Sequence, residues 1–502
     1  MKRVLLQTVL FACFSLLCDM AYGQTGILYR VPMQGTDNIV RYEPTTGKHV
    51  TYLLVSGVEN HFSLTDMNTL IDVRVAIGLN VKDFEIIDGM VFFCGENGGG
   101  SGFLGWFDID SLFHLAGRAH IDQTLLTLGL QTLDNIEVFR NPSTGNVHIA
   151  GYGLHSDEGS NLRLYRAFEA IGTLASGMAY RTLDLWSSGV YGDVSDVDVT
   201  DNLVVYLSSS RNQACDDHVG IGIYLQPFPK YDMFGTPPFY YHFFQLSYMS
   251  PSYSYCCVVP INNDPYNDLY NNVHPRMVHS TGDEVAVCTH RTDLNDVSPY
   301  FYPGPYGLCA RMLAKAAYIT HMRFDLSALV PSTNNYIQMA SYVVAKLPDT
   351  LVYSIDGFEY DPQTHRYAIL HRHVPLSGVA EHAVTTVNFI SGGTPAYFES
   401  SYQTFHNTSS GWMPKSICLD GSLQYTVMGY DMVSSEYIMW HNSFVPYAGG
   451  CDNIVQYPTS EIPLVPAKYY ENEVKSTSWM PLLFVEQESL PFGEAPCIQM
   501  CN

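Results

Sequence analysis

Acidic side chains recur at one position of a repeated apolar strand. Glu85, Glu137, Asp198 and Glu359 each stand among apolar neighbours, a few residues before a tight turn. If these strands line a common axis, we expect the four carboxylates to converge as a ring that binds a cation or sugar hydroxyls. The alternative is structural, with each carboxylate accepting hydrogen bonds from backbone N–H groups of its own turn or of the adjacent unit. Repetition favours the structural interpretation, because a structural need recurs in every unit whereas a catalytic site does not.

Two histidines, His371 and His373, lie two residues apart on an expected strand, so their side chains share a face. Imidazoles at this spacing bind a metal when another unit supplies a third ligand. Such pairs are more often hydrogen-bonded or exposed, which makes these two weak candidates. We therefore predict no metal site and no cofactor.

Aromatic residues gather in the segment 298–307, whose sequence is SPYFYPGPYG. Proline and glycine among the rings predict a surface loop rather than a strand. Such rings stack on sugars or form the central contacts of a protein interface. The alternative is that they pack onto the body of the protein. The candidate ligand-binding rings are Tyr300, Phe301, Tyr302 and Tyr306.

A repeated phrase supplies the strands that position these residues. Each copy has an apolar strand with a polar residue, a tight turn such as Asp88-Gly89, and a second apolar strand. The six copies begin at residues 81, 133, 194, 274, 355 and 414, so they recur every 52 to 81 residues. Hairpins that cannot bury both faces alone predict small sheets stacked radially around an axis.

The sequence thus predicts an all-β fold, a β-propeller with six blades favoured. Seven blades is the alternative, in which residues 24–80 hold a further, degenerate blade. The similar segments 37–42 (DNIVRY) and 452–457 (DNIVQY) suggest that N- and C-terminal strands close the ring within one blade. We expect residues 24–457 to form the propeller and the proline-containing residues 458–502 to form an irregular tail around it.

In form, the repeat resembles that of bacterial exported β-propeller proteins, most of which have no assigned activity. The resemblance covers about residues 30–457. The Trp-Asp ending of WD40 repeats, the paired glycines of kelch repeats and the sialidase Asp-box are all absent from it. It therefore implies a fold and carries over no catalytic residue.

Residues 1–23 predict a cleaved secretory signal, with basic Lys2 and Arg3, an apolar run over 4–18, and Ala21-Tyr22-Gly23 at the cleavage site. We expect a secreted, periplasmic or cell-surface protein without membrane insertion, since the apolar run is too short to span a bilayer. The chain has 25 basic and 49 acidic residues, a net charge of −24. Removal of the signal leaves 23 basic against 48 acidic residues, or −25, which repels nucleic acid.

Ten cysteines remain after the signal, and an even number in an exported chain predicts disulfide bonds. Plausible local pairs are Cys288 with Cys309, Cys418 with Cys451, and Cys497 with Cys501. The sequence alone does not decide their connectivity.

Taken together, these features predict an exported, non-catalytic binding or scaffold protein whose partner is a glycan or a cell-surface protein. Recognition is expected through loops on one face of the propeller. The alternative is a carbohydrate-active hydrolase or lyase that draws its carboxylates from different blades. The sequence leaves the question of enzymatic activity open, leaning towards none, because the P-loop, HExxH and GxSxG motifs are missing.

Overall fold

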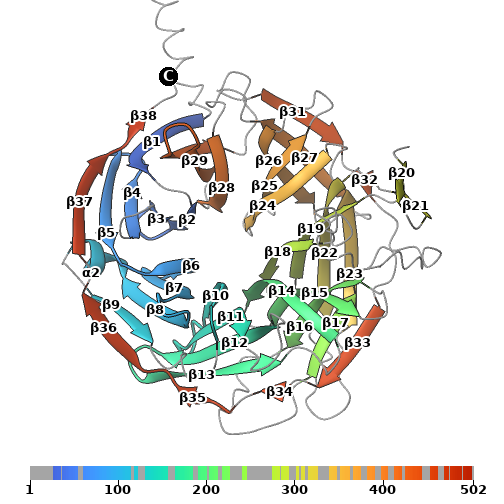
Figure 1. Ribbon diagram of the computed structural model, residues 1–502, viewed down its shortest axis with the longest axis horizontal. Helices are drawn as coiled ribbons and strands as arrows, with labels where there is room; N and C mark the ends of the chain where they lie inside the picture. Colours follow the sequence, from blue (N-terminus) through green and yellow to red (C-terminus); the bar gives the residue numbers. More distant parts are fainter. Residues whose placement is uncertain are drawn as a thin grey trace, which may run out of the picture.

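The computed structural model describes residues 26–34, 37–54, 60–114, 118–122, 130–155, 164–184, 190–200, 203–212, 217–225, 240–245, 274–282, 284–292, 301–304, 307–310, 315–325, 338–346, 351–361, 366–374, 381–390, 397–404, 412–420, 424–443, 453–458, 460–461, 468–473, 475–476, 478–488 and 490–499. Small antiparallel sheets surround a central axis (Figure 1), so the predicted all-β, propeller-like arrangement is confirmed. No helix in these ranges is long and apolar enough to cross a membrane.

The strands of the described ranges form seven sheets of five or six strands and one two-stranded sheet. The preference for six units is therefore not confirmed. The additional sheet comes from residues 37–76, the segment in which the alternative placed a further blade.

Each larger sheet has four strands in sequence, numbered outward from the axis (Figure 1). In the first half of the chain they are β2 (Asp37–Glu43), β3 (Lys48–Leu54), β4 (His61–Asp66) and β5 (Ile71–Ala76); β6 (Asn80–Ile87), β7 (Met90–Glu96), β8 (Gly102–Asp108) and β9 (Arg118–Asp122); β10 (Asn135–Arg140), β11 (Val147–His155), β12 (Leu164–Thr173) and β13 (Gly177–Asp184); and β14 (Val190–Val199), β15 (Leu203–Asn212), β16 (Asp217–Leu225) and β17 (Tyr240–Gln245). A short helix, α2 (Ile109–His114), lies between β8 and β9.

The second half continues in the same way, except that the chain's first long strand joins its last sheet. The strands are β18 (His274–Thr281), β19 (Glu284–Thr292), β22 (Lys315–Asp325) and β23 (Gln338–Lys346); β24 (Leu351–Asp361), β25 (Arg366–Val374), β26 (Glu381–Ile390) and β27 (Tyr397–Thr404); and β28 (Trp412–Leu419), β29 (Gln424–Asp431) and β30 (Glu436–Ser443) with β1 (Gly26–Gln34). Strand β1 pairs antiparallel with β30 from Gly26 opposite Asn442 to Gln34 opposite Glu436.

The six repeat copies predicted from the sequence are confirmed as hairpins. They correspond to β6–β7, β10–β11, β14–β15, β18–β19, β24–β25 and β28–β29. In the first of them, Asp88 and Gly89 both have positive φ, at 50° and 75°. This is the backbone that a two-residue turn requires to match the twist of its strands, and it explains the Asp-Gly sequence there.

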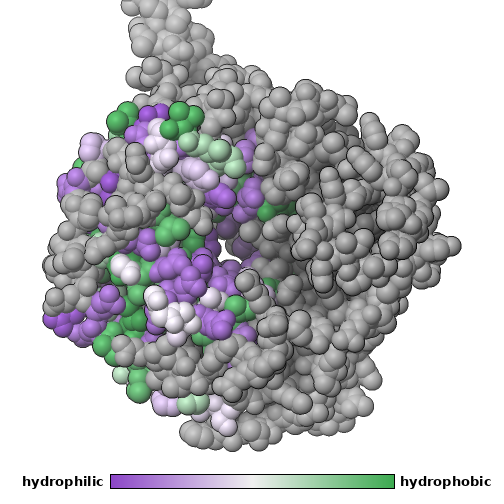
Figure 2. Space-filling model, viewed as in Figure 1, coloured by the Kyte–Doolittle hydropathy of each residue, from purple (hydrophilic) through white to green (hydrophobic). Residues whose placement is uncertain are grey.

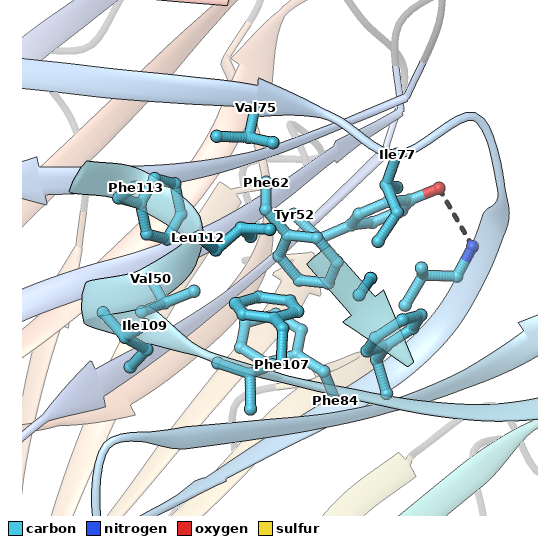
Figure 3. Packing of buried hydrophobic residues seen from close by; sticks show 14 of the residues in the cluster. Val50, Tyr52, Phe62, Val75, Ile77, Phe84, Phe107, Ile109, Leu112 and Phe113 are labelled. Carbon is cyan, nitrogen blue, oxygen red and sulfur yellow. Dashed lines mark hydrogen bonds between the residues drawn. The ribbon is translucent and has the colours of Figure 1, made fainter. Parts of the chain in front are cut away.

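Apolar side chains fill the spaces between neighbouring sheets. Between the sheet β2–β5 and the sheet β6–β9, Phe62 makes edge-on contacts with Phe84 and Phe107, at centroid distances of 5.3 and 5.0 Å (Figure 3). It makes a third such contact with Phe93 at 5.6 Å. Tyr52 in this cluster donates its hydroxyl hydrogen to the Leu79 carbonyl at 2.9 Å. Its hydroxyl oxygen accepts from Val81 N at 3.0 Å, so the polar tip of the ring is satisfied.

The C-terminal segment adds an outer strand to every one of these sheets, and we call it the C-terminal belt (β31–β38). Its strands are β31 (Asn453–Pro458), β32 (Ser460–Glu461), β33 (Lys468–Glu473), β34 (Lys475–Ser476), β35 (Met480–Pro481), β36 (Phe484–Glu488), β37 (Leu490–Pro496) and β38 (Ile498–Gln499). They pair in turn with β27, β23, β17, β13 (both β34 and β35), β9, β5 and β1. The belt thus runs around the body against the direction of the chain (Figure 1).

The belt corrects two expectations about the chain ends. Residues 458–502 were expected to be irregular, yet their described part contains seven strands, β32–β38. The similar segments 37–42 and 452–457 are not equivalent, because β2 is an innermost strand whereas β31 is the outer edge of another sheet. Proline is compatible with these positions, since an edge strand leaves one row of N–H groups unused.

No predicted disulfide is seen among the described residues, and the side chains of the expected partners Cys309, Cys451 and Cys501 lie outside them. Cys288, Cys418 and Cys497 are free thiols buried in the fold, as is Cys94. Cys288 and Cys418 occupy strands whose apolar side chains pack between sheets, so each behaves as a small core residue.

Candidate functional site

The innermost strands carry the four predicted acidic residues to the axis. In the strand register, Glu85, Glu137, Asp198 and Glu359 lie opposite Phe92, Ala150, Val205 and Ala368 of the second strand in their sheets, which are equivalent positions. Each innermost strand also contacts the next, in the order β2, β6, β10, β14, β18, β24, β28 and back to β2. Four different sheets therefore supply one acid each to the same circle.

The same register adds three residues that the sequence comparison missed. In the remaining three sheets, the equivalent residues of the innermost strands are Arg41, His279 and Cys418. They pair with Val50, Ala286 and Thr426 of the second strands. His279, rather than Val278, holds the equivalent position, because it follows the bulge between Pro275 and Met277 by two residues, as Glu85 follows the bulge between Val81 and Asp83. We call these seven residues the axial ring: Arg41, Glu85, Glu137, Asp198, His279, Glu359 and Cys418.

Arg41 is the cation of the axial ring. Its Nε donates to Glu85 Oε1 at 2.7 Å, and its Nη2 donates to Asp83 Oδ1 at 3.2 Å. Its side chain is 21% exposed. One guanidinium therefore links the first sheet to two carboxylates of the second.

Two acids of the innermost strands accept hydrogen bonds from backbone N–H groups, which is the structural role considered as the alternative to ligand binding. Asp83 accepts hydrogen bonds from Phe84 N at 2.9 Å and from Ile136 N of the next sheet at 3.1 Å. Asp198 accepts from Val199 N at 2.7 Å. Asp83 and Asp198 thus fix strand geometry, which leaves Glu85, Glu137 and Glu359 as the ring carboxylates with a less structural role.

Burial in a crowded acidic environment shifts the ring carboxylates towards their neutral forms. Burial raises the pKa of Glu85 to about 7, although Arg41 opposes the shift. Burial likewise raises the pKa of Glu359 to about 7. Burial, together with the charges of Glu85 and Asp198, raises the pKa of Glu137 well above its ordinary value. Near neutral pH the ring therefore holds both ionised and protonated carboxyls, which accept and donate hydrogen bonds respectively.

His279 joins the fifth sheet to the sixth. Its Nε2 lies 2.6 Å from the Phe358 carbonyl, so this nitrogen carries the hydrogen and donates it. The Glu359 carboxylate lies 3.9 Å from the same nitrogen. Burial lowers the pKa of His279, so the ring histidine is neutral at neutral pH.

An opening on the axis exposes this level of the molecule. Figure 2 shows the opening at the centre of the body, with mainly hydrophilic residues among those coloured around it. The side chains of Glu85, Glu359 and His279 are 19%, 23% and 25% exposed. Water and small polar molecules therefore have access to ring side chains whose remaining surface is packed.

The predicted aromatic site lies elsewhere. Phe301 and Tyr302 belong to β20 (Phe301–Gly304), which pairs with β21 (Gly307–Ala310), so this part of 298–307 is a hairpin strand and not a loop. Figure 1 shows this hairpin at the outer rim. Tyr300 and Tyr306 lie outside the described residues. The hairpin and the axial ring are therefore separate, and the two halves of the predicted binding surface do not meet.

The histidine pair is internal to one sheet. His371 and His373 share β25 as predicted, and His371 Nε2 lies 2.8 Å from Thr385 Oγ1 of β26. His371 is buried. Within the described ranges, no group of three His, Cys, Asp or Glu side chains is arranged to hold a metal ion.

The chain has the architecture of a β-propeller-like protein with an acidic axial ring. Its sequence matches no protein-family model and no curated protein. The ring residues themselves are therefore the basis for inferring what the protein does.

Proposed function

We propose that this is an exported, non-catalytic binding or scaffold protein that recognises a hydroxyl-rich ligand, a glycan, at the axial ring. The observation that supports the proposal is that acids from four sheets and Arg41 gather where the axis is open. Sugar hydroxyls donate to ionised carboxylates and accept from protonated carboxyls and guanidinium groups. A ring that holds both kinds of carboxyl suits such a ligand.

A glycan array probed with the chain lacking residues 1–23 tests the proposal. We expect binding that weakens at least about tenfold in Glu137→Met and in Arg41→Met, since each loses a polar contact. Glu486→Gln is the matched control, because Glu486 is an exposed acid on the belt, far from the axis. Glycan binding that none of the ring variants changes would contradict the axial site. Loss of that binding in Tyr302→Ala alone would move it to the rim hairpin.

A carbohydrate-active hydrolase or lyase is the second candidate. The supporting observation is that Glu85 and Glu359 come from different sheets, have access to solvent, and have pKa values of about 7. A carboxyl with such a pKa acts as a general acid near neutral pH. Release of reducing ends from bound glycans, abolished in Glu359→Gln and retained in Glu486→Gln, would establish this candidate in place of the first.

We also propose that the frame is a closed ring of seven blades, with β1 completing the last one. Its support is the unbroken succession of contacts among the innermost strands. Another support is the hydrogen bond that Ser416 Oγ of β28 donates to Asn38 Oδ1 of β2 at 3.0 Å. The double variant Asn38→Cys/Ser416→Cys is expected to form an internal disulfide, located by peptide mapping, whereas neither single variant does. An uncrosslinked double variant would contradict closure.

Export is proposed on the basis of residues 1–23. The expected observation is a mature protein outside the cytoplasm whose first residue is Gln24. An intact N-terminus on the purified protein would contradict it.

A further inference from the structure

One contact between sheets is polar at its centre. It joins the sheet β2–β5 to the sheet of β28–β30 and β1, and we call it the seam. Across it, Thr426 Oγ1 of β29 lies 2.9 Å from His49 Nε2 of β3 and 2.9 Å from His441 Nδ1 of β30. His441 Nε2 in turn lies 3.0 Å from Gln424 Oε1.

The hydrogens in this series of hydrogen bonds have one consistent arrangement. Gln424 Oε1 only accepts, so His441 Nε2 carries a hydrogen and neutral His441 has a lone pair on Nδ1. Thr426 therefore donates to His441 Nδ1 and accepts from His49 Nε2. His49 Nδ1 is left as a buried lone pair with no hydrogen-bond partner in the described structure. The series of hydrogen bonds from His49 through Thr426 and His441 to Gln424 needs both histidines to be neutral.

A proton added to either histidine breaks this arrangement. On His49 the added N–H would lie buried without an acceptor, and on His441 it would point at the hydroxyl hydrogen of Thr426. Charge on either ring would also be desolvated, because His49 and Thr426 are buried. The two imidazole centroids are 6.0 Å apart, so charging both adds repulsion.

The surroundings offer little to stabilise such a charge. On β2, the Tyr42 ring is tilted against that of His49 with the centroids 5.4 Å apart, and on β4 the cross-strand partner of His49 is neutral Thr65. On β1 the partner of His441 is Ile27. Cys418 on β28 is a buried thiol. The charge of Glu43 helps to raise the pKa of Tyr42, after burial and Asp420, and its carboxylate already accepts hydrogen bonds from Thr45 N and Thr46 N. Asp420 is the anion that acts on His441, and its effect is smaller than that of burial.

The other face of the sheet β2–β5 is built differently. Its contact with the sheet β6–β9 is an apolar cluster in which Phe62, Phe84 and Phe93 meet. Protonation has no direct effect on that contact. The two sides of the first sheet therefore differ in their response to acid.

We propose that the seam is an acid-sensitive closure, at which protonation of His49 or His441 separates β29 and β30 from β3 while the apolar contact between the sheet β2–β5 and the sheet β6–β9 remains intact. The sign follows from linkage. Burial lowers the pKa of His49 to about 3, below its ordinary value of 6.5. The closed seam therefore loses stability progressively as pH falls from 6.5 towards 3. At about pH 5, freeing His49 alone raises the opening equilibrium roughly 30-fold.

Buried thiols report on the opening. Cys418 packs in the apolar cluster at the seam, whereas Cys94 belongs to the cluster around Leu104 and Ile149. The full chain without residues 1–23 is labelled with a dithiodipyridine, which reacts with thiols in mild acid, and labelled sites are mapped by mass spectrometry. Rates are corrected with the same cysteine peptides in the unfolded chain. From about pH 7.5 to about pH 5 we expect Cys418 labelling to accelerate at least about 30-fold and Cys94 labelling less than about threefold.

Variants assign the effect to the seam. His49→Gln keeps a donor to Thr426 but cannot be protonated, so it should remove most of the acceleration at Cys418. His148→Gln is the matched control, because His148 is a buried histidine of β11 whose pKa burial lowers to about 4, away from the seam. It should leave the acceleration intact. Thr426→Val should speed Cys418 labelling at neutral pH as well.

Two results would overturn the proposal. In the first, Cys94 accelerates together with Cys418, which would show global unfolding. In the second, His49→Gln retains the full acceleration. If His49→Gln does not fold, the comparison of Cys418 with Cys94 in the unaltered chain decides alone.

Discussion

Replacing Glu359 by glutamine is expected to stabilise the protein in mild alkali and to have no effect in mild acid. Burial raises the pKa of Glu359 from 4.5 to about 7. An acid whose pKa is higher in the folded state contributes its stability below the ordinary pKa and loses it as pH rises through the folded pKa. The unaltered protein therefore carries a charge at the axis that the folded state disfavours above about pH 7.

The size of the effect follows from that shift. A rise from 4.5 to about 7 corresponds to about 3 kcal/mol once the carboxyl is fully ionised. The side chain is 23% exposed, and solvent screening reduces the expected gain to about 2 kcal/mol. Glutamine has nearly the same shape and carries no charge. Since His279 is neutral, little attraction is lost across the 3.9 Å that separates it from Glu359.

Urea denaturation at about pH 8 and about pH 4.5 measures the difference in unfolding free energy. We expect Glu359→Gln to gain about 2 kcal/mol at the higher pH and nothing measurable at the lower pH. Glu486→Gln is the control without an alkaline gain, because Glu486 is exposed and the neighbouring Arg118 lowers its pKa rather than raising it. A gain of equal size at both pH values would show a packing effect and refute the electrostatic reasoning. A loss at about pH 8 would show that the ring favours ionised Glu359.

Three further changes test the frame that positions the ring. Truncation before residue 453 removes the belt and leaves the outer strands of the sheets unpaired, so we expect oligomers or aggregates by light scattering; a stable monomer would contradict this expectation. Arg181→Met leaves Glu169, its partner at 2.8 Å, buried without its counter-charge, and should cost about 3–5 kcal/mol by urea denaturation, whereas Arg118→Met at the exposed pair with Glu486 should change nothing measurable. Phe62→Ala opens a cavity where four rings meet and should cost about 3–5 kcal/mol; a loss below about 1 kcal/mol would show that the sheets collapse to fill it.

The repeated hairpins were predictable because their apolar strands and turns are local signals. The same signal is present in residues 37–76, which form the additional sheet β2–β5. Residues 38–47 (NIVRYEPTTG) match 135–145 (NIEVFRNPSTG) closely, with Pro and Gly at the turn of each. The likeness between 37–42 and 452–457 pointed instead to a shared blade. It is misleading, because β2 is the inner edge of one sheet and β31 the outer edge of another.

The axial ring was predictable in its acids and not in its remaining members. Glu85, Glu137, Asp198 and Glu359 share a position in the repeat. Arg41 lies before the six copies, in residues 37–76, and His279 lies one residue beyond the position that counting from residue 274 assigns to the fourth copy. The belt gave little strand signal because an edge strand needs few apolar residues and tolerates Pro481, Pro491 and Pro496. The seam joins residues about 377 positions apart, a pairing that the chain does not reveal until it is folded.

The direction of the belt bears on how the protein is made. Strands β31–β38 are synthesised after the sheets whose edges they cover, and they reach those sheets in reverse order, so the edge of β5, formed early, is among the last to be paired. A nascent chain that has completed its central sheets still presents their uncovered rims to chaperones, proteases and other chains. A chain whose belt strands have not yet paired therefore leaves the outer edge of every larger sheet uncovered.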